Sequence, residues 1–516
     1  MPVDASVFGQ PVTGWPAWMI AEQVRHGRIT ASEVLQAHLE QIRARNTELN
    51  AIVTVAEDSA RAQAAGIDKT VASGADPGPL AGVPFTVKDL IATRGLRSTA
   101  GSLLLRDYRP SWGATAVDRL VAAAAVLIGK SNCPEFGLAL HTRNRLFGET
   151  LNPIGPGLSP GGSSGGDAAA VASGMAAFGI GTDYGGSIRL PAHCTGLASL
   201  RPTPGLVPGT GQLPFAPGPA PVPPSTVSLQ ARLQTIGPMA RSVADLWPLL
   251  QVMAGPDDID GNTVPVPIGQ PETIAVSALA VAWCDGDGSY PVRADLVAVV
   301  EAAARALART GARVAARRPP GLDRAEEVYA ALRDLEGLPD HHALAGGHEG
   351  QLTDYVRAML AAVPPPSGPA ALRELTAAAD QIRTEVYTFM RDWPIVLLPV
   401  ASVPAFPPGT DRFTVHGEEL TGPQIESCCR AVTLLKVPVT VVRCGYSREG
   451  LPVGIQVIGR PFHDAETVAV AMALERHFGP DRRLSCLAPR RAGCRGKPIE
   501  RVFPLRQPTA RYQRID

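Results

Sequence analysis

A glycine- and serine-rich segment, residues 159–204, holds the side chains of this chain that are best suited to covalent chemistry. Glycines surround three serines there (Ser163, Ser164 and Ser187), where a core helix or strand would avoid them, so the backbone is expected to approach another group closely. In the run Asp-Tyr-Gly-Gly-Ser that ends at Ser187, two glycines let successive N–H groups point at one place beside the hydroxyl. This pattern predicts a nucleophile next to an oxyanion site.

A serine hydroxyl is a weak nucleophile unless a base takes its proton, and the sequence offers a lysine for this task. The ten histidines form no evident triad, and His193, in a Pro-Ala-His-Cys turn, is interpreted as structural. Lys88 ends an apolar run that is predicted to be a buried strand, where loss of solvent lowers a lysine pKa. Only five of the 48 basic residues are lysines. Because arginine does not lose its proton, this scarcity marks Lys88 and Lys130.

Other glycine-rich motifs fit this chain less well. The GKS at residues 129–131 has Ala124 where a phosphate-binding loop needs glycine, and GIGTDYG lacks the spacing of a dinucleotide-binding loop. A GxSxG match surrounds Ser163, but the nucleophile elbow of an α/β-hydrolase follows a strand, and here GPGLSP precedes it. An esterase of that type is therefore only a minor alternative.

The elements that position these groups alternate between helix and strand. Thr30 and Glu33 have capping-box spacing before an amphipathic run. Further helices are predicted at 293–309, 370–392 and 467–477, and buried strands at 83–87, 125–128, 395–398, 437–442 and 453–458. Such alternation indicates an α/β sheet with helices on both faces.

Two segments differ from this pattern. Residues 201–224 contain nine prolines and are predicted to form an extended loop, either a surface connection or a wall of the substrate pocket. The last residues, 488–516, are rich in arginine and proline and are predicted to be a flexible, basic tail. Residues 1–487 are then expected to form one large domain, whose core spans about residues 80–205.

Composition limits the class of protein and its partners. Of 516 residues, 45% are apolar and 19% charged, as in a soluble globular protein. The 48 basic and 48 acidic residues balance, so binding to nucleic acid or to a membrane surface is not expected. No apolar run approaches a membrane span, and the first residues lack the features of a secretory signal, so we expect a cytoplasmic protein. Eight cysteines without CxxC spacing indicate neither a disulfide framework nor a zinc site.

The combined motifs resemble the amidase signature family of Ser-Ser-Lys hydrolases. The resemblance rests first on residues 161–191, with GGSSGG and GTDYGGSIRLP at the family's separation. GVPFTVKD around Lys88, GKSNCPEFG at 129–137 and LPVGIQVIGRP at 451–461 resemble the same family, and the likeness covers about residues 17–480. It implies a single large α/β domain with a central twisted sheet, mixed but mostly parallel, covered by helices on both faces.

The resemblance also implies roles for individual residues. Ser187 would be the acylated nucleophile, Ser163 a bridging serine that follows a cis peptide from Gly162, and Lys88 the general base. The backbone amides of Tyr184, Gly185, Gly186 and Ser187 would form the oxyanion hole. Asp183 and Arg189 would be supporting charges, and Ser164 would either join this hydrogen-bond network or cap the following helix. Lys130 is expected to be structural, and neither a metal nor an organic cofactor is implied.

The substrate is less defined by the sequence. Residues near the nucleophile (Tyr184, Phe136, Leu138 and Leu146) indicate a small apolar amide, aryl or alkyl, and the same acyl-enzyme would admit anilides, esters and carbamates. We therefore expect a stand-alone amidase, as a monomer or homodimer. The alternative is the glutaminase subunit of a tRNA-dependent amidotransferase, disfavoured here because the proline-rich segment after Leu200-Arg201-Pro202-Thr203 replaces that family's Ser/Arg-rich stretch. A catalytically silent binding protein is disfavoured because Lys88, Ser163 and Ser187 are all present.

Overall fold

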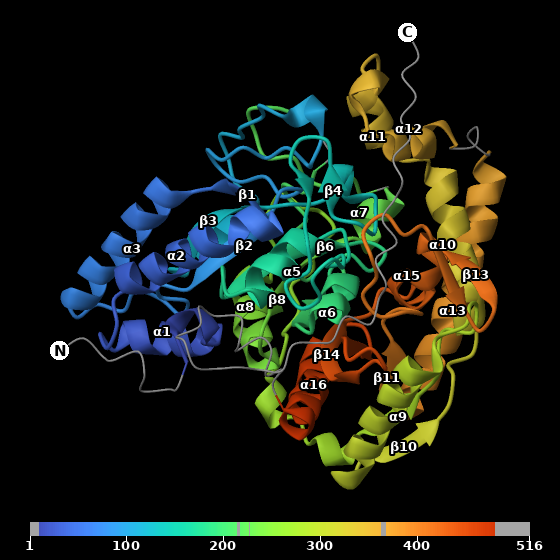
Figure 1. The fold of residues 1–516 in the computed structure, drawn as a ribbon. Helices are drawn as coiled ribbons and strands as arrows, with labels where there is room; N and C mark the ends of the chain where they lie inside the picture. The colour runs from blue at the N-terminus through green and yellow to red at the C-terminus, as the bar shows by residue number, and fades with distance from the viewer. Residues whose placement is uncertain (1–9, 214–216, 227, 363–367, 480–516) are drawn as a thin grey trace.

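The computed structural model describes residues 10–213, 217–226, 228–362 and 368–479 (Figure 1). The predicted tail at 488–516, and the expected domain boundary at 487, lie outside the described residues. No helix within these ranges is long and apolar enough to cross a membrane.

One sheet runs through the whole molecule. Within the described ranges it has eleven strands in the order β1-β3-β2-β6-β8-β7-β14-β15-β11-β9-β10. Its strands are β1 (Ile52–Val55), β2 (Pro84–Lys88), β3 (Val126–Ser131), β6 (Phe178–Asp183), β7 (Ala198–Arg201), β8 (Thr235–Ala240), β9 (Ala280–Trp283), β10 (Arg313–Ala316), β11 (Ile395–Pro399), β14 (Val439–Tyr446) and β15 (Pro452–Ile458). Two small hairpin pairs stand apart from it, β4 (Arg143–Asn144) with β5 (Gly148–Glu149) and β12 (Arg412–Val415) with β13 (Glu418–Thr421).

The expected mixed α/β sheet is confirmed, and its parallel pairings are gathered in two blocks. One block joins β3, β2 and β6, and the other joins β10, β9 and β11. Between the blocks, β8, β7, β14 and β15 pair antiparallel with their neighbours. Antiparallel pairing is therefore more frequent than the alternation of helices and strands suggests, because β14 and β15 form a hairpin and β8 inserts between β6 and β7.

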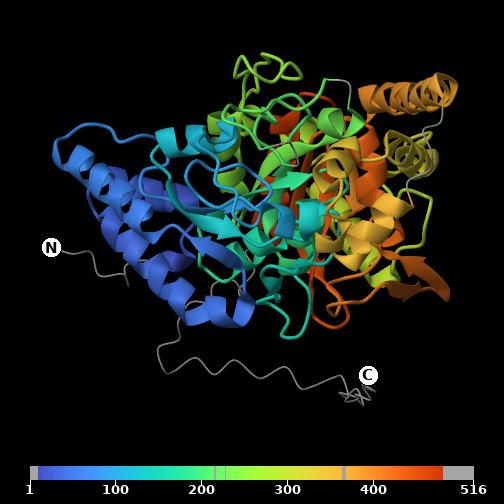
Figure 2. The same cartoon turned by 90° about the horizontal axis from the view of Figure 1, so that it is seen from above.

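Helices cover both faces of the sheet and extend beyond its two ends. Helices α5 and α6 contact each other and the central strands, while α8, α9 and α16 form a second group against the strands. Helices α1 to α3 lie at one end of the molecule, and α9, α10 and α13 lie at the other (Figures 1 and 2). The helices are α1 (Ala17–Arg25), α2 (Ala31–Leu49), α3 (Glu57–Ala72), α4 (Thr115–Ala122), α5 (Gly165–Ala172), α6 (Arg189–Thr195), α7 (Leu229–Leu233), α8 (Leu246–Met253), α9 (Ala294–Arg309), α10 (Leu322–Glu336), α11 (Pro339–Ala345), α12 (Asp354–Ala361), α13 (Pro369–Asp392), α14 (Gly422–Ile425), α15 (Ser427–Leu434) and α16 (Asp464–Phe478).

The elements predicted from the sequence are confirmed, with ends that differ by up to four residues. The five predicted buried strands are β2, β3, β11, β14 and β15, and the three later helices are α9, α13 and α16. The capping box is present at the start of α2, where the Thr30 hydroxyl accepts from Glu33 N at 3.0 Å and Thr30 N donates to Glu33 Oε2 at 2.9 Å.

Strand order brings the chemical groups to one edge of the sheet. β2 and β6 are parallel neighbours, and Phe85 stacks on Phe178 with ring centroids 5.0 Å apart. Because parallel strands end at the same edge, Lys88 at the end of β2 lies close to Asp183 at the end of β6. The fold thus places the predicted base beside the glycine-rich turn that carries Ser187.

The proline-rich segment has a buried half and an exposed half. Leu213 is 1% exposed, and its N–H donates to Leu90 O at 2.9 Å. Ala92 N donates to Gly211 O at 2.8 Å, and Gly209 N donates to an Asp260 carboxylate oxygen at 2.8 Å. Residues 217–224 are mostly exposed. The first half is therefore packed over the chain that follows Lys88, and the second half lies at the surface, as expected for a surface connection. A role of the segment as a wall of the substrate pocket stays a prediction.

Candidate active site

Lys88 is fully buried at the end of β2 and bonds to two hydroxyl groups. Its Nζ donates to Ser163 Oγ at 2.6 Å and to Thr182 Oγ1 at 2.9 Å. Thr182 lies on β6, directly before Asp183, and is not among the site residues predicted from the sequence. The two hydroxyls fix the position of the amine, so a proton can pass between Lys88 and Ser163 without a movement of either chain segment.

Burial sets the protonation of Lys88. Loss of solvent lowers the pKa of this amine from 10.5 to about 8, although Cys133, Asp167 and Asp183 act in the opposite direction. Asp167, one of these carboxyl groups, is itself affected by burial, which raises its pKa to about 6. Hydrogen bonds to it, such as the one from Thr86 Oγ1 at 2.8 Å, act in the opposite direction. An appreciable share of Lys88 is therefore neutral close to physiological pH, as a base requires.

Ser163 and Ser164 lie on a turn that touches the loop of Ser187. The peptide bond between Gly162 and Ser163 is cis. Ser164 N donates to Ser187 O at 3.0 Å, so the two serine segments run side by side. The Ser164 hydroxyl donates to Thr182 O at 3.4 Å and makes no side-chain cap on α5. Of its two expected roles, the structure shows the hydrogen bond to the network.

Ser187 lies on the loop between β6 and α6 and is partly exposed. Gly186 has a φ of +131°, and a Cβ at this position would lie 2.9 Å from the Cβ of Cys429. Glycine is therefore required here both for the backbone conformation and for the close approach of α15. The loop can therefore turn tightly beside α15, and Ser187 stays partly exposed.

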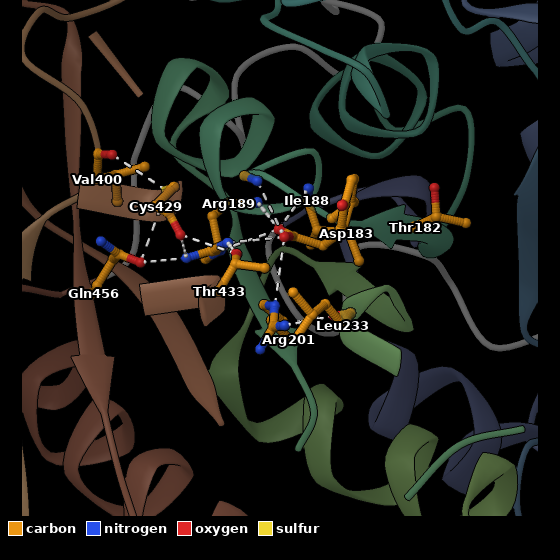
Figure 3. Close-up of polar contacts among 12 residues, drawn as sticks. Thr182, Asp183, Ile188, Arg189, Arg201, Leu233, Val400, Cys429, Thr433 and Gln456 are labelled. Atoms are coloured by element: carbon orange, nitrogen blue, oxygen red, sulfur yellow. Dashed lines mark hydrogen bonds and ion pairs between the residues drawn. The ribbon is translucent and has the colours of Figure 1, made fainter. Parts of the chain in front are cut away.

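Asp183 holds this loop from below (Figure 3). Its carboxylate accepts hydrogen bonds from Gly186 N at 3.1 Å, Ile188 N at 3.1 Å and the Arg189 guanidinium at 2.8 and 3.0 Å. Arg201 adds a second ion pair at 3.5 Å.

The expected oxyanion hole therefore needs a correction. The Gly186 amide is directed to Asp183, which leaves the amides of Tyr184, Gly185 and Ser187 as the remaining candidates.

Arg189 connects this loop to the C-terminal half of the chain (Figure 3). Its guanidinium donates to Gln456 Oε1 at 2.8 Å, to Cys429 O at 2.9 Å and to Thr433 Oγ1 at 2.7 Å. Burial alone would raise the pKa of Asp183, but the two guanidinium groups hold it well below its usual range. Asp183 and Arg189 are thus more than a simple ion pair, because they fix the loop that carries Ser187 to α15 and β15.

Charged residues from remote segments lie beside the same loop. A Cβ on Gly185 would lie 3.6 Å from Arg430 Cγ, and one on Gly186 would lie 3.4 Å from Glu426 Oε1. Arg430 forms an ion pair with Glu326 at 3.3 Å. Burial raises the pKa of Glu426 to about 8, and Arg430 opposes this shift. These residues could not be recognised from the sequence, because no motif links α10 and α15 to Ser187.

The apolar residues that suggested an apolar substrate are placed differently from one another. Phe136 is 2% exposed and packs into a hydrophobic cluster with Leu90 and Val356, so it belongs to the core. Tyr184 is partly exposed, and its ring lies 5.4 Å from that of Tyr329, whose hydroxyl donates to Tyr184 O at 3.0 Å. The surroundings of the loop are therefore aromatic and charged rather than purely apolar.

A cleft of about 1030 Å³ lies beside the Ala139–Leu140 segment. Its walls include Ala139, Leu140, Tyr355 and Gly422. Ala139 O and Leu140 O lie 2.7 and 2.9 Å from the position of a Cβ on Gly162. The Ala139–Leu140 segment thus lies between this cleft and the backbone of Gly162.

Lys130 and His193 lie apart from the Lys88–Ser163 contact. Lys130 is fully buried, and its Nζ donates to Ile91 O, to Thr93 Oγ1 at 2.9 Å and to Ser98 Oγ at 3.2 Å. His193 contacts two backbone carbonyls, Gly454 O at 3.2 Å and Val403 O at 3.1 Å. Both side chains have partners typical of structural residues. Across the described ranges, no group of three or more His, Cys, Asp or Glu side chains could hold a metal ion.

Comparison with known proteins identifies the family. The family model described as Amidase matches residues 33–468. A glutamyl-tRNA(Gln) amidotransferase subunit from Synechococcus sp. (strain RCC307) is 31% identical over 501 residues, which cover 90% of this chain and 97% of that protein. A bacterial aryl acylamidase of the amidase signature family has a TM-score of 0.81 at 26% identity, covering 93% of this chain and 99% of that one. The corresponding amidotransferase subunit from Thermotoga maritima has a TM-score of 0.72 at 26% identity, covering 92% and 96%. The chain therefore belongs to the amidase signature family and is a hydrolase that acts on C–N amide bonds.

Proposed function

We propose that Ser187 is the acylated nucleophile, with Ser163 as the bridging serine and Lys88 as the general base. The observation that carries this proposal is the 2.6 Å contact between the buried Lys88 amine and Ser163 Oγ. Neutral Lys88 accepts the Ser163 proton while Ser163 accepts the Ser187 proton, and Ser187 Oγ attacks the amide carbon. The N–H groups of Tyr184, Gly185 and Ser187 stabilise the oxyanion.

The second half of the reaction uses the same groups in the reverse direction. Protonated Lys88 returns a proton through Ser163 to the leaving nitrogen, and the C–N bond breaks to give an ester on Ser187. Water then attacks this acyl-enzyme, gives its proton to the relay and releases the carboxylic acid. Gly162, Ser164, Asp183 and Arg189 support the reaction by holding the two serine segments in place.

For the substrate, we propose a small polar amide, with glutamine as the first candidate. Two observations support it, namely the polar side chains of Glu426 and Arg430 beside the nucleophile loop and the 31% identity to a glutamyl-tRNA(Gln) amidotransferase subunit. In this role the chain would act with partner subunits, which would use the released ammonia. This reverses the preference drawn from the sequence, because that preference rested on local residues only.

A stand-alone amidase for neutral amides, anilides or carbamates is the second candidate. It is supported by the likeness to the aryl acylamidase and by the aromatic surface of Tyr184 and Tyr329. Both candidate functions share the acyl-enzyme at Ser187, and their substrates differ in the groups attached to the amide.

A hydrolysis screen with the purified chain separates the candidates. Release of ammonia from glutamine, compared with product release from neutral primary amides, anilides and carbamates, is measured with and without amidotransferase partner subunits. Ser187→Ala is the control for contaminating hydrolases. Faster turnover of glutamine, increased by partners, supports the first candidate. Turnover of anilides by the chain alone, with glutamine inert under both conditions, supports the second. A Ser187→Ala variant that keeps full activity contradicts the proposed nucleophile.

A further inference from the structure

One face of α10 lies against the nucleophile loop, which carries Ser187 between β6 and α6. Glu326, Tyr329 and Arg333 are spaced i, i+3 and i+7, so they share this face. Tyr329 donates to Tyr184 O at 3.0 Å, and Glu326 pairs with Arg430 at 3.3 Å. Arg333 lies one helical turn beyond Tyr329, about 6 Å along the axis. It is thus the next side chain along the wall that begins at Tyr184.

Arg333 has no acidic partner among the described residues. Its Nη2 donates to the sulfur of Met359 at 3.2 Å, and no carboxylate of the described residues forms an ion pair with it. Glu336, three residues later, is occupied elsewhere, because it accepts from Ser228 Oγ, Leu229 N and Gln230 N at 2.6 to 3.0 Å. Arg333 is partly buried between α10 and α12.

A partly buried guanidinium with a thioether as its partner has unused donors in fixed directions. The five N–H donors of a guanidinium form a planar fork that matches the geometry of carboxylates and phosphates. Hydrogen bonds between charged groups are also stronger than those between neutral groups. Burial raises the pKa of Tyr184, Tyr355 and Glu426, and the Arg333 charge opposes each of these shifts. Arg333 therefore lies within electrostatic range of Tyr184 in the Ser187 loop and of Tyr355 in the cleft wall.

We infer that Arg333 is a specificity residue that binds a carboxylate of the substrate. The enzyme would then select amides that carry a second, anionic group a few bonds from the scissile carbonyl. Tyr329 and the Arg430–Glu326 pair hold α10 against the loop and thereby fix the distance between Arg333 and Ser187. This inference rests on the proposed function, which supplies the acyl-enzyme at Ser187.

A pair of substrates tests the inference. Glutaric acid monoamide and pentanamide have the same chain length, and only the first carries a carboxylate. Wild type should favour the monoamide in kcat/KM by roughly 10- to 150-fold, the range expected for a hydrogen bond to a charged group. Arg333→Met should remove this preference, mainly through KM, and leave pentanamide turnover unchanged. Arg333→Lys should restore part of it. Arg324→Met, on the same helix but paired with Glu385, is the matched control and should keep the full preference.

Each result has a distinct meaning. If wild type hydrolyses both amides equally, or if Arg333→Met keeps the preference, the inference is wrong while the proposed amidase function stands. If Ser187→Ala and wild type are equally inactive on both amides and on glutamine, the failure lies with the proposed substrate class. Inhibition of wild-type pentanamide hydrolysis by glutarate, with no inhibition by pentanol, supports the inference even if Arg333→Met fails to fold. Equal inhibition by both compounds would overturn it.

Discussion

Replacing Lys88 gives the sharpest test of the proposed base. Since its pKa is about 8, about a tenth of the lysine is neutral at pH 7 and about nine-tenths at pH 9. Wild-type kcat/KM should therefore rise about tenfold between these values, because only the neutral amine accepts a proton. Lys88→Met should lose roughly 10²- to 10⁴-fold in rate, the usual loss for a positioned base. Lys88→Arg should be as inactive, because arginine stays protonated.

Lys130 provides a matched control for this experiment. It is equally buried, and burial likewise lowers its pKa to about 8, but its bonds go to Ile91, Thr93 and Ser98 rather than to Ser163. Lys130→Met should therefore leave the midpoint of the pH profile unchanged, whatever its effect on the rate. Stopped assays at constant ionic strength between pH 6 and 10 measure both profiles. A Lys88→Arg variant that keeps more than a tenth of the wild-type rate, or a midpoint that moves with Lys130, would refute the assignment.

The same pKa predicts how stability depends on pH. The unfolded lysine, with a pKa near 10.5, binds its proton at pH values where the folded lysine has already lost it. Between about pH 8 and 10.5 the unfolded state holds more protons, so the Lys88 contribution to the free energy of unfolding rises with pH. The full change is on the order of 3 kcal/mol. Urea denaturation at pH 8 and pH 10 should show a smaller pH-dependent difference for Lys88→Met than for wild type.

Three further predictions concern the rest of the site and its support. A fluorophosphonate should label Ser187, and peptide mass spectrometry that finds the adduct on Ser163 would contradict the proposed nucleophile. Leu213→Ala should lower the free energy of unfolding by about 2–5 kcal/mol, because this side chain is buried above the chain that follows Lys88. An unchanged urea midpoint would show that the proline-rich segment contributes little to packing. Amide hydrolysis should persist in EDTA, since the proposed relay uses only Lys88, Ser163 and Ser187, and activity lost in EDTA but restored by zinc would rule this relay out.

The sequence predicted those parts of the molecule that depend on short-range patterns. Lys88 could be found because it ends an apolar strand, and Ser187 because two glycines precede it. The buried strands could be placed because short apolar runs are local signals, and the long helices because their apolar residues recur at helical spacing. Arg333, Glu426 and Arg430 could not be found in this way, because their place beside the loop depends on the packing of α10 against α15, about a hundred residues apart. Thr182 could have been noticed, since it directly precedes the Asp183 turn.

The antiparallel pairings in the sheet likewise could not be predicted from local sequence patterns. The insertion of β8 between β6 and β7 brings together strands that are separated by long loops, and nothing in Thr235–Ala240 specifies this neighbour. The engagement of the Gly186 amide by Asp183 is a similar case. The sequence shows that the two glycines allow an unusual backbone conformation. Which backbone N–H donates to each oxygen of the Asp183 carboxylate depends on the geometry of the turn.

The contacts of Arg189 have a consequence for the order of events on the ribosome. Its partners Cys429, Thr433 and Gln456 follow it by 240 to 267 residues. At a synthesis rate of roughly 5–20 residues per second, on the order of ten to fifty seconds pass between the synthesis of Ser187 and that of the last residue that fixes its loop. During this time the nascent chain carries Lys88, Ser163 and Ser187 but lacks α15 and β15, against which the loop is held. We expect that hydrolytic activity appears only when the chain is nearly complete, and that products truncated before residue 429 contain the whole relay without being enzymes.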